Sequence, residues 1–224
     1  MQDPQFVHRA FADIAPRYVV TNHVLSFGLD RWWRRVVARE AVALAPQSIL
    51  DLATGSGDLA LSLRRALPDV PLLAADFCAP MLKEAARAGV RPLVVADGMR
   101  LPLQDQAVDL VTVAFGLRNM ASWPDALREM RRVLRPGGHL MVLDFSMPSG
   151  VPGRLYDFYL GKVMPRVAGC ITGQRGAYEY LNQSIRAFPS GQAMIDLQQD
   201  CGFARVRARP LTMGVVSLYI GQAA

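Results

Sequence analysis

Short apolar runs alternate along the chain with segments whose apolar residues recur every three or four positions. The apolar runs predict five strands, at residues 48–52, 70–75, 92–96, 108–114 and 139–145. The run at 108–114 is β-branched and almost continuously apolar, which is typical of a strand buried on both faces of a sheet. Strands and helices that alternate in this order predict a parallel, doubly wound α/β sheet.

Helices are predicted between the strands from single apolar faces and from residues that begin or end a helix. The first two are expected at 59–67 and 81–88. The third is expected to begin at Ser122, with Pro124 in its first turn, and to end at 135–138 (Arg-Pro-Gly-Gly).

The last part of the chain predicts one more helix and an edge pair of strands. Ser190 is expected to cap this helix and Gly202 to end it. Its inward residues are expected to be Met194, Ile195, Leu197 and Cys201. Two strands, 204–209 and 215–220, are then expected to form a hairpin-like pair at the sheet edge.

Two segments fall outside this alternation. Residues 6–45 favour helices with breaks, in which Trp32, Val36 and Val37 form one apolar stripe. Residues 147–190 are rich in Gly, Pro, Tyr and Arg, and we interpret them as an insertion over the active face. We therefore expect one domain over 1–224, with a helical cap at 1–46 and this insertion at 147–190.

Composition limits the class of protein. The chain has 224 residues, of which 51% are hydrophobic and 20% charged, as in an ordinary globular domain. Three scattered cysteines do not suit a disulfide framework, so we expect a reducing, cytoplasmic setting. Neither a signal peptide nor a transmembrane helix is expected. The net charge of +6 is compatible with an anionic partner but does not require one.

A glycine loop carries the first chemical signal. Gly55-Ser-Gly57 follows a strand and opens a helix, and Ala60 completes a Gly-x-Gly-x-x-Ala pattern. Asp76 ends the next strand, where a nucleotide-binding fold places an acid for ribose hydroxyls. The pattern fits NAD, FAD or S-adenosylmethionine. A phosphate-binding P-loop is excluded because Gly-Lys-Ser/Thr is missing, and Ser56 does not stand in a hydrolase Gly-x-Ser-x-Gly elbow.

Later segments narrow this choice. Asp97-Gly98 ends the third strand, where an acid could meet an adenine amino group. The fourth strand runs into 115–119 (Phe-Gly-Leu-Arg-Asn). A dehydrogenase would also need a catalytic domain, for which the chain has no room.

With these segments the chain resembles class I S-adenosylmethionine-dependent methyltransferases. It is most similar to the UbiE/MenG type of menaquinone and ubiquinone biosynthesis C-methyltransferases. The most specific segments are 115–119 and 143–146 (Leu-Asp-Phe-Ser). The likeness also includes Asn22, Trp32 or Trp33 with Arg34, and residues 11–18, 25–28, 51–58, 75–76, 80–82, 96–98, 178–181, 184–185, 188–189 and 214–216. It therefore covers almost the whole chain.

The resemblance implies a Rossmann-like class I methyltransferase fold, with a seven-stranded, mostly parallel sheet and helices on both faces. It implies S-adenosyl-L-methionine as the methyl donor. The cofactor-binding residues would be Asp51, Ala53, Gly55, Ser56, Gly57, Asp76, Phe77, Met81, Asp97, Gly98, Ala114 and Phe115. Ala114 stands where the family usually has serine, so a contact there would fall to the backbone.

Four residues are candidates for catalysis: Arg118, Asn119, Asp144 and Tyr178. Arg118 stays protonated and cannot act as a base, but it could stabilise a phenolate. It could equally be a salt-bridge residue, and Asp144 could be a buried structural acid. No metal-ligand spacing is present among the histidines and cysteines.

The leading functional hypothesis is C-methylation of a demethylated quinol of the demethylmenaquinol type. The alternatives are methylation of another small phenol or natural product, methylation of RNA, and ligand binding without catalysis. No basic stripe with interleaved aromatic residues points to nucleic acid. We expect a lipid quinol or another small phenol as substrate, peripheral membrane contact and a homodimer.

Overall fold

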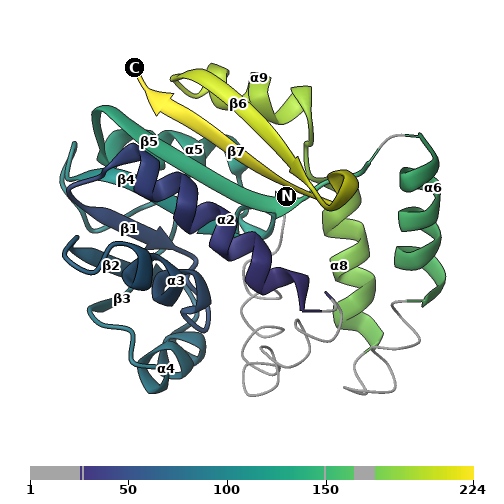
Figure 1. Cartoon of the computed structure of the whole chain (residues 1–224), viewed down its shortest axis with the longest axis horizontal. Coiled ribbons are helices and arrows are strands. Elements are labelled where there is room, and N and C mark those ends of the chain that lie inside the picture. The colour runs from purple at the N-terminus through teal and green to yellow at the C-terminus, as the bar shows by residue number, and fades with distance from the viewer. Residues whose placement is uncertain (1–25, 27, 149, 164–174) are drawn as a thin grey trace.

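The computed structural model describes every residue except 1–25, 27, 149 and 164–174. Seven strands of the described part form one sheet in the order β3-β2-β1-β4-β5-β7-β6 (Figure 1). They are β1 (Ile49–Leu52), β2 (Leu72–Asp76), β3 (Leu93–Val95), β4 (Val108–Ala114), β5 (Leu134–Phe145), β6 (Phe203–Leu211) and β7 (Val216–Ala223). Only β7 runs antiparallel to its neighbours β5 and β6; the other pairs are parallel. The predicted mostly parallel sheet and its edge pair are confirmed.

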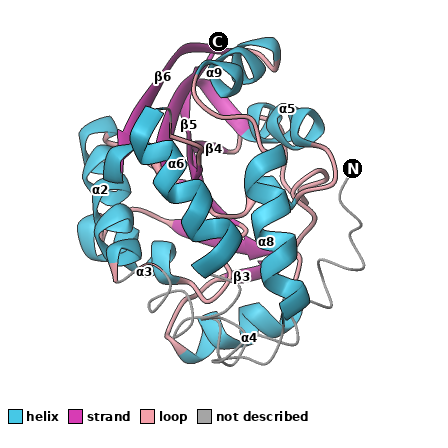
Figure 2. Ribbon diagram, turned by 90° about the vertical axis from the view of Figure 1, so that its right-hand side faces the viewer, coloured by secondary structure: helices cyan, strands magenta, loops and turns pink. Residues whose placement is uncertain are grey.

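Helices cover both faces of this sheet. One face carries α2 (Leu29–Leu44), α3 (Asp58–Ala66) and α4 (Ala79–Arg87). The other carries α5 (Trp123–Val133) and α9 (Gln192–Asp200). Figure 2 shows α2 and α3 on one side of the strands and α5 on the other. The two apolar clusters therefore lie on opposite faces, with the buried strands β1 and β4 between them.

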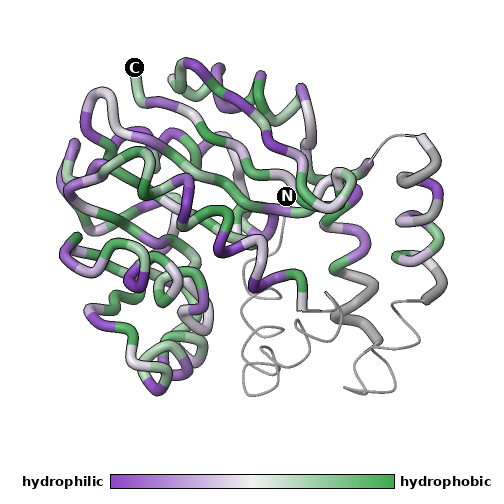
Figure 3. The backbone as a smooth tube through the Cα atoms, in the orientation of Figure 1, coloured by the Kyte–Doolittle hydropathy of each residue, from purple (hydrophilic) through white to green (hydrophobic). Residues whose placement is uncertain are grey.

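The hydropathy of each strand follows its place in the sheet. The central strands are mainly hydrophobic in Figure 3, whereas β6 alternates between hydrophobic and hydrophilic residues. Such alternation is expected at an edge strand with one exposed face. The predicted strand at 108–114 coincides with β4 (Val108–Ala114).

Two local predictions at helices are wrong. Trp33 is 3% exposed and shares the inner face of α2 with Val36 and Val37, while Trp32 is 41% exposed. Residues at i, i+3 and i+4 share a helix face, so the stripe begins at Trp33. Helix α9 is capped by Gly191 at φ +59 without a side-chain bond, not by Ser190.

The predicted helix end at 135–138 is displaced. Helix α5 ends at Val133, and β5 begins at once with Leu134 opposite Val108. The register then shifts before the main pairing resumes at His139. The Arg-Pro-Gly-Gly turn is therefore an irregular start of β5. The N-cap prediction holds, because Ser122 Oγ accepts a hydrogen bond from the Asp125 amide.

The segment 147–190 contains two described α-helices, α6 (Gly150–Phe158) and α8 (Arg175–Ala187), and a π-helical turn, η2 (Tyr159–Val163). Helix α8 packs beside a 3₁₀ turn, η1 (Leu117–Asn119), which follows β4. These helices stand beyond the carboxyl ends of the central strands (Figure 1). The cap predicted at 1–46 falls largely outside the described residues. The single domain and the insertion over the active face stay predictions.

Candidate active site

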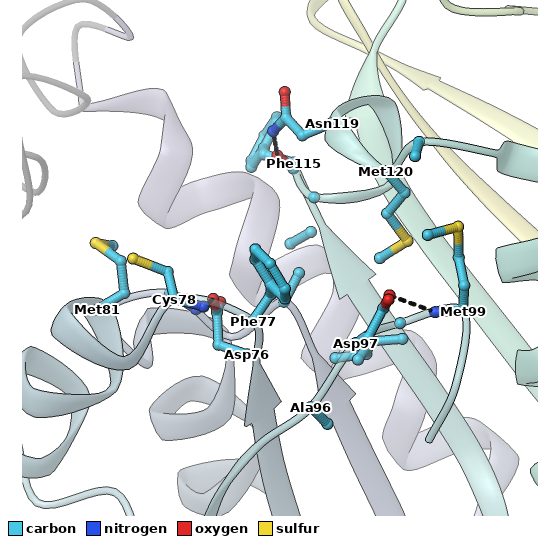
Figure 4. A pocket seen from close by; sticks show the side chains of 17 residues that line it. Asp76, Phe77, Cys78, Met81, Ala96, Asp97, Met99, Phe115, Asn119 and Met120 are labelled. Carbon is cyan, nitrogen blue, oxygen red and sulfur yellow. Dashed lines mark hydrogen bonds between the residues drawn. The ribbon is translucent and has the colours of Figure 1, made fainter. Parts of the chain in front are cut away.

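A pocket opens at the carboxyl ends of β1, β2, β3 and β4, close to the point where the chain order of the sheet reverses between β1 and β4. Open α/β sheets bind ligands at such switch points. Figure 4 shows the pocket, with Met81, Cys78 and Asp76 on one side and Asp97, Met99 and Met120 on the other. Its lining consists of Leu52, Ala53, Gly55, Asp76, Phe77, Cys78, Met81, Ala96, Asp97, Gly98, Met99, Ala114, Phe115, Gly116, Asn119, Met120 and Ala121.

The glycine loop between β1 and α3 requires both of its glycines. Gly55 and Gly57 have φ values of +57° and +84°, which L side chains rarely adopt. A Cβ at Gly57 would also lie 2.5 Å from Val90 Cγ2. Gly57 therefore lets the start of α3 pack closely against Val90, while Gly55 lines the pocket.

Asp76 is held in place by the backbone. Its Oδ2 accepts a hydrogen bond of 2.7 Å from the Gly55 amide, and its Oδ1 accepts one of 2.8 Å from the Cys78 amide. Charge-assisted bonds of this kind fix the plane of a carboxylate. The strand end and the glycine loop thus present one carboxylate to the pocket, at the position predicted for a ribose contact.

Asp97 and Gly98 form the opposite wall. Asp97 Oδ1 accepts a hydrogen bond of 2.9 Å from the Met99 amide (Figure 4). A Cβ at Gly98 would lie 2.8 Å from Met120 Cε, so this glycine makes room for the methionine. Met81, Met99 and Met120 give the pocket flexible, polarisable sides that suit an apolar, aromatic ligand group.

Three predicted cofactor residues lie behind the lining. Asp51 is buried and accepts hydrogen bonds from Thr54 Oγ1 at 2.6 Å and Thr112 Oγ1 at 2.7 Å. Burial raises its pKa to about 6, against the opposing effect of these hydroxyls. Ser56 Oγ donates to Asp58, and Gly57 serves helix packing. These residues shape the loop from beneath, whereas the other nine predicted cofactor residues line the pocket.

Sequence reasoning missed four lining residues and placed three in motifs without assigning them a role. The missed residues are Cys78, Met99, Met120 and Ala121, and the unassigned ones are Leu52, Ala96 and Gly116. Leu52, Cys78, Ala96 and Met99 each lie within four residues of a strand end, so proximity to predicted strand ends was a usable signal. Met120 and Ala121 follow η1 and carry no recognisable pattern.

The turn after β4 is tightly built around Phe115. This residue has φ +57°, and its carbonyl accepts hydrogen bonds from Arg118 Nη1 at 2.6 Å and Asn119 Nδ2 at 3.3 Å. A Cβ at Gly116 would lie 2.4 Å from Ala53 Cβ. Only glycine therefore fits where this turn crosses the glycine loop, and the ring of Phe115 lines the pocket.

Arg118 and Asp144 form a buried ion pair. Arg118 Nη1 lies 2.8 Å from Asp144 Oδ1, and the guanidinium carbon lies 5.2 Å from the centre of the Phe145 ring. Burial raises the pKa of Asp144, and the charge and hydrogen bonds of Arg118 act in the opposite direction. Neither residue lines the pocket, whereas Asn119 does. Arg118 thus forms the salt bridge that the sequence left open as an alternative to a catalytic role.

Three aromatic rings stand beside that pair. The centre of the Phe115 ring lies 5.8 Å from Trp33 and 4.9 Å from Phe145. They join α2 to the carboxyl ends of β4 and β5. Tyr178, the fourth catalytic candidate, belongs to α8, but its side chain lies outside the described part.

Within the described ranges, no group of three or more His, Cys, Asp and Glu residues is arranged to hold a metal ion. Likewise, no helix in the part of the chain described here is long and apolar enough to cross a membrane.

Known proteins resemble the chain over nearly all its length. A family model described as the ubiE/COQ5 methyltransferase family matches residues 1–223. A demethylmenaquinone methyltransferase of Deinococcus radiodurans is 43% identical, over 97% of this chain and 92% of its own. One of Thermus thermophilus is 46% identical, over 94% of this chain and 98% of its own.

Solved structures support the fold. A SAM-dependent methyltransferase of Thermotoga maritima matches 96% of this chain and 99% of its own, with a TM-score of 0.67 and 17% identity. One of Aquifex aeolicus matches 80% and 82%, with a TM-score of 0.53 and 17% identity. At this identity the likeness concerns the fold, which is the predicted one.

Proposed function

Because the chain belongs to the ubiE/COQ5 methyltransferase family and is an S-adenosylmethionine-dependent methyltransferase, we propose that it methylates a ring carbon of a demethylated quinol of the demethylmenaquinol type. Relatives that carry the name demethylmenaquinone methyltransferase cover nearly the whole chain. The observation that carries the proposal is the pocket at the sheet's switch point, where the glycine loop holds Asp76 and where Asn119 also belongs to the lining.

The residues around the pocket fit S-adenosylmethionine. Asp76 would accept hydrogen bonds from the two ribose hydroxyls, since its plane is already set by two amides. Asp97 would accept from the adenine amino group, with methionines along the ring. When bound, S-adenosylmethionine supplies an electrophilic methyl group attached to sulfur.

The acceptor carbon of a quinol becomes nucleophilic when a neighbouring hydroxyl loses its proton. A phenol with a pKa near 10 costs roughly 4 kcal/mol to ionise at neutral pH, at about 1.4 kcal/mol per unit. A site can lower this cost with hydrogen bonds to the phenolate. Asn119 is the polar group of the 115–119 turn that reaches the pocket, and we assign it to this contact.

We assign Arg118 and Asp144 a positioning role. A buried pair of opposite charges projects little net field into the pocket, and Arg118 bonds the Phe115 carbonyl directly. It would act by holding Phe115 and Asn119 where the reacting groups meet, because small misplacements slow an in-line transfer strongly. Tyr178 stays a candidate for contact with the substrate from α8.

Product analysis tests the proposal. Purified enzyme would be incubated with S-adenosylmethionine and a series of demethylated quinols, alongside phenols that lack the quinol pattern. Mass spectrometry and fragmentation should show one methyl group on a ring carbon of the quinols. Methylation of an oxygen, or methylation of the other phenols alone, would support the alternative of another small phenolic substrate.

A further inference from the structure

The outer face of α2 carries a row of arginines. Arg31, Arg35 and Arg39 recur every four residues, and all three are exposed. Within the described chain none of them takes part in an ion pair, in contrast to Arg34, which pairs with Asp30. Like charges at this spacing destabilise a helix. Three guanidinium groups in a row therefore favour an anionic surface outside the molecule.

Exposed apolar side chains accompany the row. Leu29 is 38% exposed and Trp32 41% exposed, both at the start of the helix, and Val42 is exposed at its far end. We call Leu29, Arg31, Trp32, Arg35, Arg39 and Val42 the α2 outer face. A tryptophan among arginines is typical of helices that lie at a membrane interface, because its ring is amphipathic.

A neighbouring turn, η3 (Thr212–Gly214), extends the apolar part of this surface. Thr212 Oγ1 accepts a hydrogen bond of 2.8 Å from Trp33 Nε1, which fixes the turn beside the start of α2. Met213 follows and is 78% exposed. The helix and the turn between β6 and β7 thus expose apolar side chains close to each other.

Charge on the β6 side has the same sign. Glu40 of α2 accepts hydrogen bonds from Arg207 at 2.8 Å and from Arg209 at 2.6 Å. The one carboxylate is shared between two arginines, so this flank adds to the positive charge of the α2 outer face.

The inner face of the same helix reaches the pocket. Trp33 packs against Phe115, with 5.8 Å between ring centres, and Phe115 lines the pocket. A surface bound to the outer face near Leu29 and Trp32 would therefore lie about one helix diameter, roughly 10 Å, from the pocket wall.

We propose that the α2 outer face, together with Met213, docks the enzyme on an anionic lipid bilayer. The arginines would contact headgroup phosphates, and Leu29, Trp32 and Met213 would enter the interface. Aliphatic side chains beside the tryptophan favour lipid over nucleic acid, whose bases stack on aromatic rings. The inference rests on the proposed function, since a quinol with an apolar tail would reach the pocket from the bilayer.

Vesicle binding tests the arginines. Flotation would compare phosphatidylcholine vesicles with vesicles that contain equal parts of phosphatidylglycerol. Wild type should bind the anionic vesicles and lose affinity as salt is raised. The variant Arg31→Gln/Arg35→Gln/Arg39→Gln should bind about 100-fold more weakly, since each basic residue near such a surface contributes about fivefold.

A charge-matched control separates this face from net charge. Arg87→Gln/Arg128→Gln/Arg135→Gln removes the same charge from exposed sites on α4, α5 and β5. It should bind within about threefold of wild type, because these sites lie off the proposed face. Equal loss in both triple variants would overturn the proposal in favour of general electrostatic attraction.

Trp32→Ala tests the apolar contact. It should lower vesicle affinity several-fold at high salt, where the arginines contribute least. Unchanged affinity would remove Trp32 from the interface. Its unfolding temperature should stay near that of wild type, because the side chain is half-exposed. Tight binding of wild type to a single-stranded RNA, without binding to anionic vesicles, would overturn the choice of partner.

A comparison of two substrates separates this inference from the proposed function. A short-tailed, water-soluble demethylated quinol should be methylated equally by wild type and by the α2 triple variant. A long-tailed quinol in anionic vesicles should be methylated much more slowly by the variant. Equal rates on the vesicle substrate would overturn the docking surface while leaving the function intact. A lack of methylation of either quinol by wild type would overturn the function itself.

Discussion

The two halves of the sheet's carboxyl edge use charge differently. In the β1–β3 half, Asp76 and Asp97 face the pocket, and backbone amides of Gly55, Cys78 and Met99 hold them. In the β4–β5 half, Arg118 and Asp144 bind each other behind the lining. The first half presents its carboxylates to the pocket, whereas the second uses its charges to fix a turn. Substitutions in the β1–β3 half should therefore weaken cofactor binding. Substitutions in the β4–β5 half should lower the free energy of unfolding and the turnover rate.

Breaking the buried pair should have the largest effect. Asp144→Ala leaves Arg118 as a buried charge without its carboxylate, which costs about 3–5 kcal/mol of unfolding free energy. Urea denaturation would measure this loss. The double variant Arg118→Met/Asp144→Leu should recover much of it, because both charges are removed together. A loss below about 1 kcal/mol in Asp144→Ala would contradict the contrast between the halves.

Arg118→Lys tests the positioning role in the same region. A lysine keeps the charge but cannot reproduce the planar contacts to Asp144 and the Phe115 carbonyl. We expect turnover to fall roughly 10–100-fold with little change in cofactor affinity. Steady-state kinetics and calorimetry would separate the two. Weaker cofactor binding with normal turnover would contradict the positioning role and would show that Arg118 supports cofactor binding, as the β1–β3 half does.

The pH dependence of stability should reveal Asp51, which belongs to β1 and accepts a hydrogen bond from Thr112 of β4, across the boundary between the halves. Its pKa of about 6 in the folded state exceeds the ordinary value of 3.8. The stabilising effect of its proton is thus complete below about pH 3 and is lost as the pH rises through about 6. Wild type should lose about 3 kcal/mol of unfolding free energy relative to Asp51→Asn between about pH 3 and 7. A constant difference across that range would show that the raised pKa is wrong.

Asp76→Ala should weaken cofactor affinity by about 2 kcal/mol, on the scale of charged hydrogen bonds. Calorimetry with S-adenosylmethionine or its demethylated product would measure it. Since Asp76 bonds amides at the edge of the pocket, its loss should lower unfolding stability less than that of Asp144. Unchanged affinity would contradict the assignment of the ribose contact.

The smallest effect is expected at Ser56. Its hydroxyl donates to Asp58 and does not line the pocket. Ser56→Ala should therefore change cofactor affinity by less than about 0.5 kcal/mol. The same titration, run beside Asp76→Ala, makes it the matched control, and a loss of similar size would return Ser56 to the cofactor contacts.

The sequence predicted the fold because its strands are short, buried and apolar. β4 matches the predicted bounds, and the glycine loop with Asp76 combines residues that are close in sequence. Local pattern failed where neighbours in space decide. Helix α9 begins after Gly191 and not after Ser190, because Gly191 adopts a positive φ that the rules for helix starts did not identify. The burial of Trp33 in place of Trp32 depends on the phase of α2 against the sheet.

The site divides in the same way. Nine of twelve predicted cofactor residues line the pocket, since motif and strand ends determine their place. Arg118 and Asp144 are 26 residues apart, and no pattern in either segment predicts that their side chains form an ion pair. Met99 and Met120 were missed because apolar lining follows from packing around a cavity.

Strand β6 leaves a long row of backbone groups at the rim of the sheet, and its composition guards that rim against other chains. Pro210 has no amide hydrogen to offer, and the register is irregular between Ala204 and Arg207. Arg207 and Arg209 would meet like charges if a second β6 paired alongside. These are the devices by which natural sheets avoid edge-to-edge aggregation. Replacing Pro210, Arg207 and Arg209 with uncharged residues of high β-propensity would leave an edge strand that can pair with other chains and start fibril formation.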